Sequence, residues 1–233
     1  MQIFYCDTII DGKARFGRDE SGHCLRVLRM RRGDTISFTD GKGKFYDGLI
    51  SSDNPSEMTA EITSVRKAEE RPYRLHVAIS PVKNDDRLEW FVEKAAETGI
   101  DEITPLICSR TEKRRIRKER LEGIIVSAVK QSVKGYLPRL NDPAGFTEFV
   151  AETRPGKRLI ACCDPEIIRT AVTGAFSPGD EVTILIGPEG DFSPEEVALA
   201  VRNGFTPVHM GSSRLRTETA GIVACCSVYL SNL

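Results

Sequence analysis

The chain has 233 residues, of which 40 % are hydrophobic and 29 % are charged, and its formal net charge is −1. This composition is typical of a globular protein with one large or two smaller domains, and it excludes a uniformly basic nucleic-acid-binding chain. The apolar runs are too short to span a bilayer and the N-terminus lacks the apolar core of a signal peptide, so we expect no membrane association and a cytoplasmic location.

Residues 1–70 have the pattern of a small β-barrel. Alternating apolar and polar residues at 34–52, interrupted by the Asp40–Gly41 turn, predict a β-hairpin, and residues 56–65 predict a further strand. Leucines spaced among arginines at 22–34 predict a short helix and a turn at Gly33.

Residues 67–74 are polar and contain a proline, which predicts a domain boundary and a second domain at 73–233. Strands alternate with helices beyond it, as in an α/β domain with a parallel sheet. The expected strands lie at 75–82, 103–108, 157–163, 181–187 and 206–211, and the expected helices at 85–99, 120–132, 193–204 and 217–233. Asp86, Ser193 and Thr217 are the predicted N-caps, and Gly99 is the predicted end of the first of these helices.

Seven cysteines and three histidines are spread through the chain without the spacing of a metal site. Cys162–Cys163 and Cys225–Cys226 are adjacent pairs within apolar runs, and no C-x-x-C motif occurs. We therefore expect buried, reduced cysteines and no bound metal.

Basic residues gather in two runs. Between Lys13 and Arg32 there are seven basic and two acidic residues, and between Arg110 and Arg120 there are again seven basic and two acidic residues. Such local excesses suit phosphate contacts, although each run would also be compatible with an ordinary solvated surface. The candidate RNA-binding residues in these runs are Arg15, Arg26, Arg29, Arg31, Arg32, Arg110, Arg114 and Arg115.

The stretch ILIGPEGDFSPEE (184–196) joins a predicted strand to a predicted helix. Its glycines would let the backbone approach a ligand closely, but it matches neither the Walker nor the dinucleotide-binding pattern. Glu189 and Asp191 would repel a pyrophosphate, by about 4 kcal/mol for like charges 4 Å apart at intermediate dielectric. An uncharged or cationic ligand such as S-adenosylmethionine fits better. The alternative is a plain turn before a capped helix.

A third loop lies before the last predicted helix, within MGSSRLRTETAGIVACC. Arg214 and Arg216 flank Leu215 beside the helix N-terminus, where backbone N–H groups and guanidinium groups together favour an anion. Arg214 is therefore a further candidate for contact with an RNA phosphate.

IGPEGDFSPEE and RLRTETA together resemble the paired signature of the bacterial 16S rRNA uracil-N3 methyltransferases (RsmE-type), members of the SPOUT class of knotted methyltransferases. HCLRVLRMRRGD, EWFVEKAAETGIDEITPL and KQSVKGYLP match the same family, in order and over nearly the whole chain. In this chain Asp191 replaces a usual second glycine, Met210 precedes Gly211 where the family has Leu-Gly, and Arg214 replaces an aliphatic residue.

The resemblance implies a PUA-like RNA-binding β-barrel at 1–70 and an α/β methyltransferase domain with a trefoil knot at 73–233. It also implies a homodimer that binds S-adenosylmethionine through backbone groups of three loops, Cys162–Asp164, Ile186–Gly190 and Met210–Ala220. The cofactor-binding residues carried over are Cys162, Ile186, Gly187, Gly190, Met210, Gly211, Leu215, Thr217 and Ala220.

Methyl transfer to N3 of a uridine requires alignment with the donor, loss of the N3 proton and stabilisation of the uracil anion. Arg216 is the candidate for anion stabilisation, and Glu189 or Glu218 is the candidate proton acceptor, although Glu218 would also suit the first turn of a helix for structural reasons. Because N3 lies on the Watson–Crick edge, the uridine must be unpaired, so we expect 16S rRNA within the small ribosomal subunit as the partner.

Two other functions remain open at this level. A knotted tRNA ribose methyltransferase would normally have other residues in the first loop and would have no evident use for the N-terminal barrel. A non-catalytic RNA-binding ribosome-assembly factor would use the barrel and the basic runs but not the loop glycines.

Overall fold

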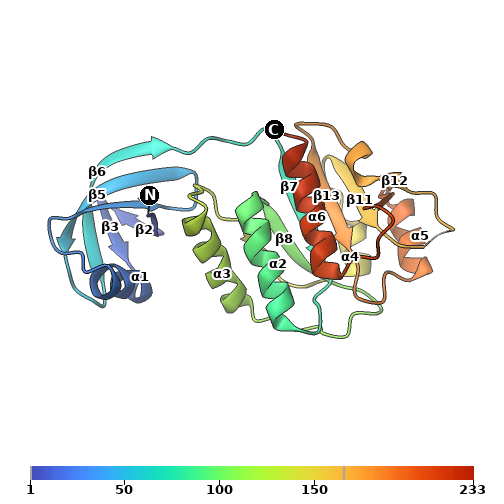
Figure 1. Ribbon diagram of the computed structural model, residues 1–233, viewed down its shortest axis with the longest axis horizontal. Helices are drawn as coiled ribbons and strands as arrows, with labels where there is room; N and C mark the ends of the chain where they lie inside the picture. Colours follow the sequence, from blue (N-terminus) through green and yellow to red (C-terminus); the bar gives the residue numbers. More distant parts are fainter. Residues whose placement is uncertain (1, 165) are drawn as a thin grey trace. The chain divides into compact units, whose positions relative to one another are not determined.

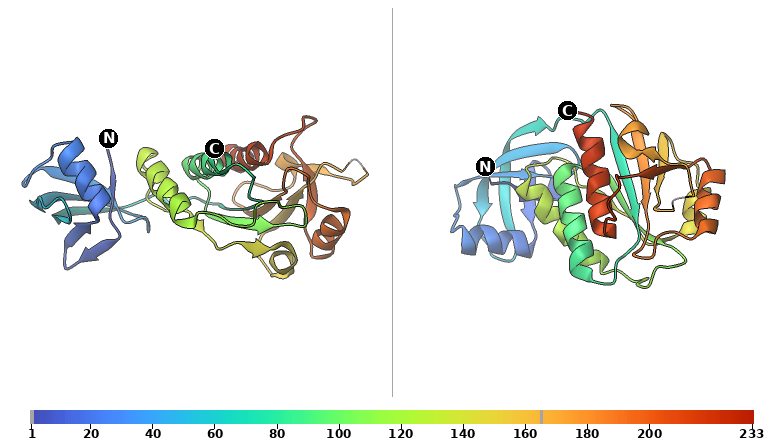
Figure 2. Two further views of the ribbon diagram at one scale, coloured as in Figure 1. Left: turned by 90° about the horizontal axis from the view of Figure 1, so that it is seen from below. Right: turned by 45° about the vertical axis from the view of Figure 1, so that its right-hand side comes forward.

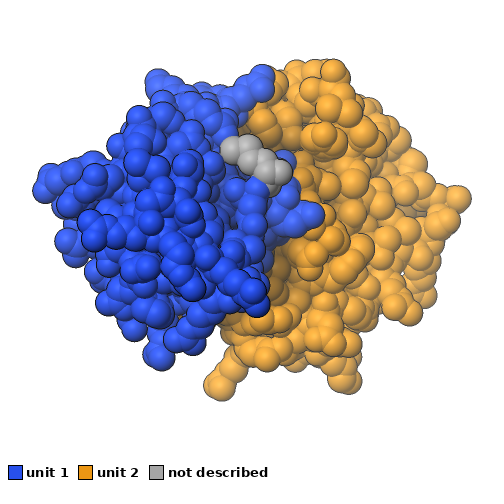
Figure 3. All heavy atoms as spheres, turned by 60° about the vertical axis from the view of Figure 1, so that its left-hand side comes forward, with its two compact units in different colours: residues 1–70, 126–137 blue, residues 71–125, 138–233 orange. Residues whose placement is uncertain are grey.

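The computed structural model describes residues 2–164 and 166–233, which divide into two compact units. Residues 1–70 and 126–137 form the first unit, and residues 71–125 and 138–233 form the second (Figure 3). The chain passes from one unit to the other at Glu70–Arg71, within the segment that the sequence marks as a boundary. Residues 126–137 were not expected in the first unit, since nothing in their local pattern shows where they pack.

The first unit is built on a mostly antiparallel sheet with the strand order β1-β4-β5-β6-β3-β2 (Figure 1). The strands are β1 (Phe4–Tyr5), β2 (Thr8–Ile10), β3 (Lys13–Phe16), β4 (Thr35–Thr39), β5 (Lys44–Ser52) and β6 (Met58–Lys67). The predicted hairpin is β4–β5, and the Asp40 carboxylate holds its turn by accepting hydrogen bonds from the backbone N–H of Lys42 at 2.7 Å and of Lys44 at 3.2 Å. Phe16, Phe38 and Tyr46 pack as an aromatic cluster inside this unit.

The short helix of the first unit begins earlier than the sequence pattern indicates. It comprises α1 (Arg18–Gly22) and a π-helical turn, η1 (His23–Val27), instead of lying within 22–34. The helix ends there because Arg29 adopts a left-handed backbone conformation with φ of 59°. Its start is held by Ser21, whose buried hydroxyl donates to the carbonyl of Phe16 and accepts from the N–H of Met58, a contact 37 residues away in sequence.

The second unit has a sheet with the order β10-β8-β7-β13-β11-β14-β12, with β9 beside β8, and every recorded pairing is parallel, as predicted. The strands are β7 (Arg74–Ile79), β8 (Glu102–Ile107), β9 (Arg139–Leu140), β10 (Ala144–Gly145), β11 (Lys157–Ala161), β12 (Thr170–Ala171), β13 (Glu181–Ile186) and β14 (Thr206–His209). The longer strands match the predicted apolar runs. β9, β10 and β12 were not predicted, because two residues carry no recognisable period.

Helices cover both faces of this sheet. α2 (Asp85–Thr98) and α6 (Thr217–Leu230) lie side by side on one face, and α4 (Phe146–Ala151) and α5 (Pro194–Arg202) cover the other (Figures 1 and 2). α2 and α6 approach so closely that a Cβ atom on Gly221 would lie 2.5 Å from the Phe91 ring. α3 (Lys118–Gln131) crosses from the second unit into the first, and η2 (Val172–Gly174) is a single 3-10 turn. No helix of the described residues is long and apolar enough to cross a membrane.

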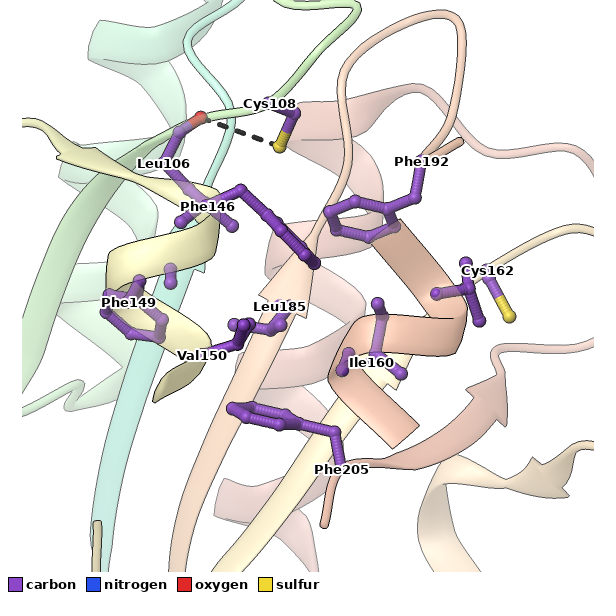
Figure 4. Close-up of a cluster of buried hydrophobic side chains, with 13 residues drawn as sticks. Leu106, Cys108, Phe146, Phe149, Val150, Ile160, Cys162, Leu185, Phe192 and Phe205 are labelled. Carbon is purple, nitrogen blue, oxygen red and sulfur yellow. Dashed lines mark hydrogen bonds between the residues drawn. The ribbon is translucent and has the colours of Figure 1, made fainter. Parts of the chain in front are cut away.

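The core between the sheet and α4/α5 is rich in phenylalanine (Figure 4). Phe146 and Phe149 of α4 pack with Phe192 and Phe205, which flank α5, over the central strands. Cys162 and Phe192 lie in this cluster and also in the loops that follow β11 and β13, so the core continues directly into these loops.

The helix ends agree with the predictions in part. Ser193 caps α5 in a complete capping box with Glu196, and Gly99 ends α2 with φ of 100°, both as predicted. The N-cap of α2 is Asn84 and not Asp86: the Asn84 side chain accepts a hydrogen bond from the Asp86 N–H. Thr217 is not the N-cap of α6, since Arg216 occupies that position and the Thr217 hydroxyl bonds elsewhere.

Replacing Ser193 by alanine should lower the free energy of unfolding by about 1 kcal/mol, because the N–H groups at the start of α5 lose their acceptor. Urea unfolding measures the change. Thr173→Ala, which removes an exposed hydroxyl from the same unit, serves as the control, and equal stability of the two variants would contradict the assigned role.

Candidate active site

A cavity of about 350 Å³ lies in the second unit, at the carboxyl ends of β11, β13 and β14. Parallel strands bring their carboxyl ends to one edge of a sheet, which is where open α/β sheets bind ligands. The three loops that the sequence selected meet here. The wall consists of Ala161–Cys163, Arg169, Ile186–Glu189, Asp191, Val208–Gly211, Ser213–Thr217 and Ala220.

The structure brings together eight of the nine candidate cofactor residues. Those on the cavity wall are Cys162, Ile186, Gly187, Met210, Gly211, Leu215, Thr217 and Ala220. Gly190 is not on the wall: its carbonyl accepts a hydrogen bond from the Arg110 guanidinium at 2.7 Å, and a Cβ atom there would lie 3.4 Å from the Arg110 side chain. Gly190 is thus a point at which the Arg110 side chain holds the loop from outside.

Hydrogen bonds join the three loops across large sequence distances. The Asp191 carboxylate accepts hydrogen bonds from the N–H groups of Cys163 and of Phe192, each at 2.8 Å, and so links the second loop to the first. The Thr217 hydroxyl donates to the carbonyl of Gly187 at 3.0 Å and links the third loop to the second. A Cβ atom on Gly187 would lie 3.2 Å from the Phe192 ring, so this position is packed closely as well.

An ion pair braces the same region from α2. The Arg87 guanidinium donates to both carboxylate oxygens of Glu218, at 2.7 and 2.6 Å, and lies 3.4 Å from the carboxylate of Glu189. Glu218 is buried in the first turn of α6 and is not on the cavity wall, whereas Glu189 and Arg216 are. Arg87 therefore connects α2 to two of the three candidate catalytic residues.

The pKa of Glu218 reflects two opposed effects. Burial by itself would raise the pKa of the carboxyl, but the hydrogen bond and charge of Arg87, together with the charge of Arg216, outweigh it and leave the pKa below its usual value. A carboxylate in this state is ionised near neutral pH and is a weak base.

The basic candidates separate into different roles. Arg15, Arg26, Arg29, Arg31 and Arg32 are exposed on the first unit, and Arg114 and Arg115 are exposed on the second. Arg214 lies on the cavity wall itself. Arg110, by contrast, donates hydrogen bonds to the carbonyls of Gly190 and Phe192, so its guanidinium group is engaged by the protein itself.

Much of the second basic run is neutralised by carboxylates. Lys113 and Arg117 pair with Asp85, Arg117 and Arg120 pair with Glu89, and Lys118 pairs with Asp142. Arg110, Arg114 and Arg115 are the cations of the run without an ion pair among the described residues, and of these Arg110 is held by carbonyls, which leaves Arg114 and Arg115 available.

Sequence reasoning missed several residues of this site. Arg87 could not have been found, because its partner is 131 residues away and an arginine in a helical first turn has no distinctive pattern. Arg169 and His209 also lie on the wall, outside the three loops that the sequence selected. The sequence showed Asp191 as a departure from the family motif, but its hydrogen bond to the Cys163 N–H depends on the neighbouring loop and could not be predicted.

A family model for an RNA methyltransferase domain matches residues 69–229, and a model for an RNA methyltransferase PUA domain matches residues 16–63. The chain belongs to the RNA methyltransferase family. The resemblance inferred from the loop motifs is confirmed, as is the α/β class with a PUA-like domain.

Relatives of this RNA methyltransferase chain agree with the assignment. It is 26 % identical over 229 residues to ribosomal RNA small subunit methyltransferase E of Synechocystis, covering 95 % of this chain and 74 % of that protein. Among solved structures, a probable rRNA-methyltransferase from Porphyromonas gingivalis is 40 % identical with a TM-score of 0.93, covering 100 % of this chain and 98 % of the other. A ribosomal RNA small subunit methyltransferase E from Neisseria gonorrhoeae bound to S-adenosyl methionine is 26 % identical with a TM-score of 0.84, at the same coverage.

Replacing Arg87 by methionine should leave the buried Glu218 carboxylate without its partner and destabilise the protein by about 3 kcal/mol at pH 7. In the unsubstituted protein the lowered pKa of Glu218 contributes stability above the unfolded-state pKa, and this stability is lost as the pH falls through the folded-state pKa. In the variant, burial dominates and the pKa is raised, so acidification protonates Glu218 and relieves the destabilisation.

Urea unfolding of both proteins at pH 7 and pH 5 tests this expectation: the stability difference should be larger at pH 7. Lys94→Met, which removes a cation from exposed ion pairs on the same helix, is the control and should show little pH-dependent change. A difference for Arg87→Met that is the same at both pH values would refute the role of Glu218 titration.

Proposed function

We propose that this protein transfers a methyl group from S-adenosylmethionine to N3 of a uridine in 16S rRNA of the small ribosomal subunit. The observation that carries the proposal is the cavity itself, which residues of the GPEG loop and residues of the RLRTETA loop line together. Membership of the RNA methyltransferase family and likeness to ribosomal RNA small subunit methyltransferases E support the same reaction.

The wall fits S-adenosylmethionine in size and chemistry. A volume of about 350 Å³ is in the range of small-molecule sites. Ile186, Val208 and Leu215 offer apolar surface for an adenosine, and the loops offer backbone groups for its polar edges. The carboxylates of Glu189 and Asp191 disfavour a polyphosphate but tolerate a cationic ligand.

When bound, S-adenosylmethionine would supply an electrophilic methyl group for in-line displacement. The residues of this chain would align the uracil, stabilise its anion and accept its proton. Arg216 lies on the wall beside the start of α6 and is suited to the developing negative charge on the uracil oxygens. We assign proton transfer to Glu189 or a water that it holds, and we assign Glu218, which is ion-paired and off the wall, to positioning.

The first unit is the proposed RNA-binding part. Its exposed arginines are available for phosphate contacts, and the PUA-domain match supports an interaction with RNA. The assembled small subunit, which would present an unpaired uridine, is the proposed substrate.

Two further features of the family are proposed for this chain, a trefoil knot in the second unit and a homodimer. The homodimer has support in the exposed apolar side chains that α2 and α6 carry. These include Trp90 at 43 %, Tyr229 at 39 % and Leu230 at 63 % exposure.

Incubation with labelled S-adenosylmethionine and undermethylated small subunits, followed by digestion and mapping of the label, tests the function. Label at N3 of a single uridine is expected. Transfer to tRNA ribose would replace the proposal by a knotted ribose methyltransferase. Binding to rRNA without any methyl transfer would replace it by a non-catalytic assembly factor.

Arg216→Ala should lower kcat by about 100-fold, as expected when one donor to a developing anion is removed, while changing S-adenosylmethionine affinity by less than about threefold. Single-turnover kinetics and calorimetry measure the two quantities, and Arg216→Lys should recover part of the rate. Arg202→Ala, at an exposed position of α5, is the control. Unchanged turnover of Arg216→Ala would remove this residue from the mechanism.

A further inference from the structure

Asp191 stands at the cavity wall in a backbone conformation that few side chains accept. Its φ is 61°, in the left-handed region, and its N–H donates to the carbonyl of Pro188 at 2.9 Å to close a tight turn. Aspartate tolerates this region better than most residues, because its short side chain bonds to nearby backbone groups. Here the bonds to the N–H groups of Cys163 and Phe192 hold both carboxylate oxygens in place.

The charge of Asp191 is not matched by a fixed cation. In residues 2–164 and 166–233 no ion pair to this carboxylate is formed, whereas Glu189, the other acidic residue on the wall, is paired with Arg87. Among the arginines of the wall, Arg169 donates to the carbonyl of Cys162 at 2.9 Å, while Arg214 and Arg216 are exposed. A negative charge is thus held at the wall with its position set by the backbone.

The Asp191 charge contributes to raised pKa values of the two neighbouring thiols, Cys162 and Cys163. Burial and, after it, the charge of the Asp191 carboxylate raise the pKa of the Cys162 thiol to about 11, against the smaller opposing effect of the Arg169 charge. The same two causes, burial first, raise the pKa of the Cys163 thiol. Both cysteines lie on the cavity wall, so the field of Asp191 acts on the space that they line.

Resting on the proposed function, we infer that Asp191 is a specificity-determining residue through which the cavity prefers the cationic methyl donor to the demethylated product. The donor S-adenosylmethionine and the product S-adenosylhomocysteine share their adenosine and amino-acid parts and differ by one methyl group and one positive charge at sulfur. A carboxylate held at a partly enclosed wall stabilises the cation more than the neutral thioether. Because backbone N–H groups already orient it, little reorganisation accompanies binding.

The preference has a consequence for turnover. Loss of the sulfonium charge on methyl transfer removes the attraction to Asp191, so the product is held less tightly than the donor that replaces it. The same carboxylate therefore favours exchange of product for a new donor.

Calorimetric titration of the full-length protein with S-adenosylmethionine and with S-adenosylhomocysteine tests the inference. Asp191→Asn keeps the size of the side chain but removes the charge and one acceptor. It should reduce affinity for the donor about tenfold more than affinity for the product. Glu195→Gln removes an equal charge four residues away, at an exposed position off the wall, and should leave the ratio of the two affinities unchanged.

Asp191→Gly provides a second variant, since glycine accepts the left-handed conformation without strain, and it should lose the preference in the same way. An equal loss of affinity for both ligands in either folded variant would overturn the inference and leave Asp191 as a link between loops. Failure of the unsubstituted protein to bind either ligand would instead overturn the proposed function.

Discussion

The loop after β13 is held by side chains from two other parts of the chain and by its own Asp191, and the shape of the cavity depends on these contacts. Arg110 binds its carbonyls from outside, Thr217 binds the carbonyl of Gly187 from α6, and Asp191 binds the N–H of Cys163. None of these contacts belongs to the regular hydrogen bonding of a helix or strand. They pair polar backbone groups that no helix or strand satisfies, which stabilises a fixed wall at this loop.

Charge is distributed over this site so that each carboxylate has a different environment. Glu218 is buried and paired with Arg87, Glu189 is partly exposed and more loosely paired, and Asp191 has backbone donors but no ion pair with any residue that the structure describes. Three acidic residues near one cavity would be unfavourable for a phosphate-rich cofactor. The arrangement instead suits a methyl donor that carries positive charge, with arginines at the wall for an RNA ligand.

The sequence predicted the long elements well because their signals are local. The apolar runs of β7, β8, β11 and β13 and the capping box of α5 are each complete within a few residues. The motifs GPEG and RLRTETA were also sufficient to select the loops that meet at the cavity, since parallel strands place their carboxyl ends at one edge. The errors occurred where a single local cue competed with another, as at Asn84 and Asp86, or where Arg29 bends the backbone out of a helix that the pattern would continue.

The sequence by itself therefore determined the α/β class and the family, and it selected the loops that line the cavity. Tertiary structure alone decided which side chains act on one another: the pairing of Arg87 with Glu218, the use of Arg110 to hold a loop, and the position of Gly190 away from the wall. The physical reason is distance along the chain. Hydrophobic period and capping act over a few residues, whereas these hydrogen bonds and ion pairs join groups 80 to 131 residues apart and exist only once the sheet has brought them together.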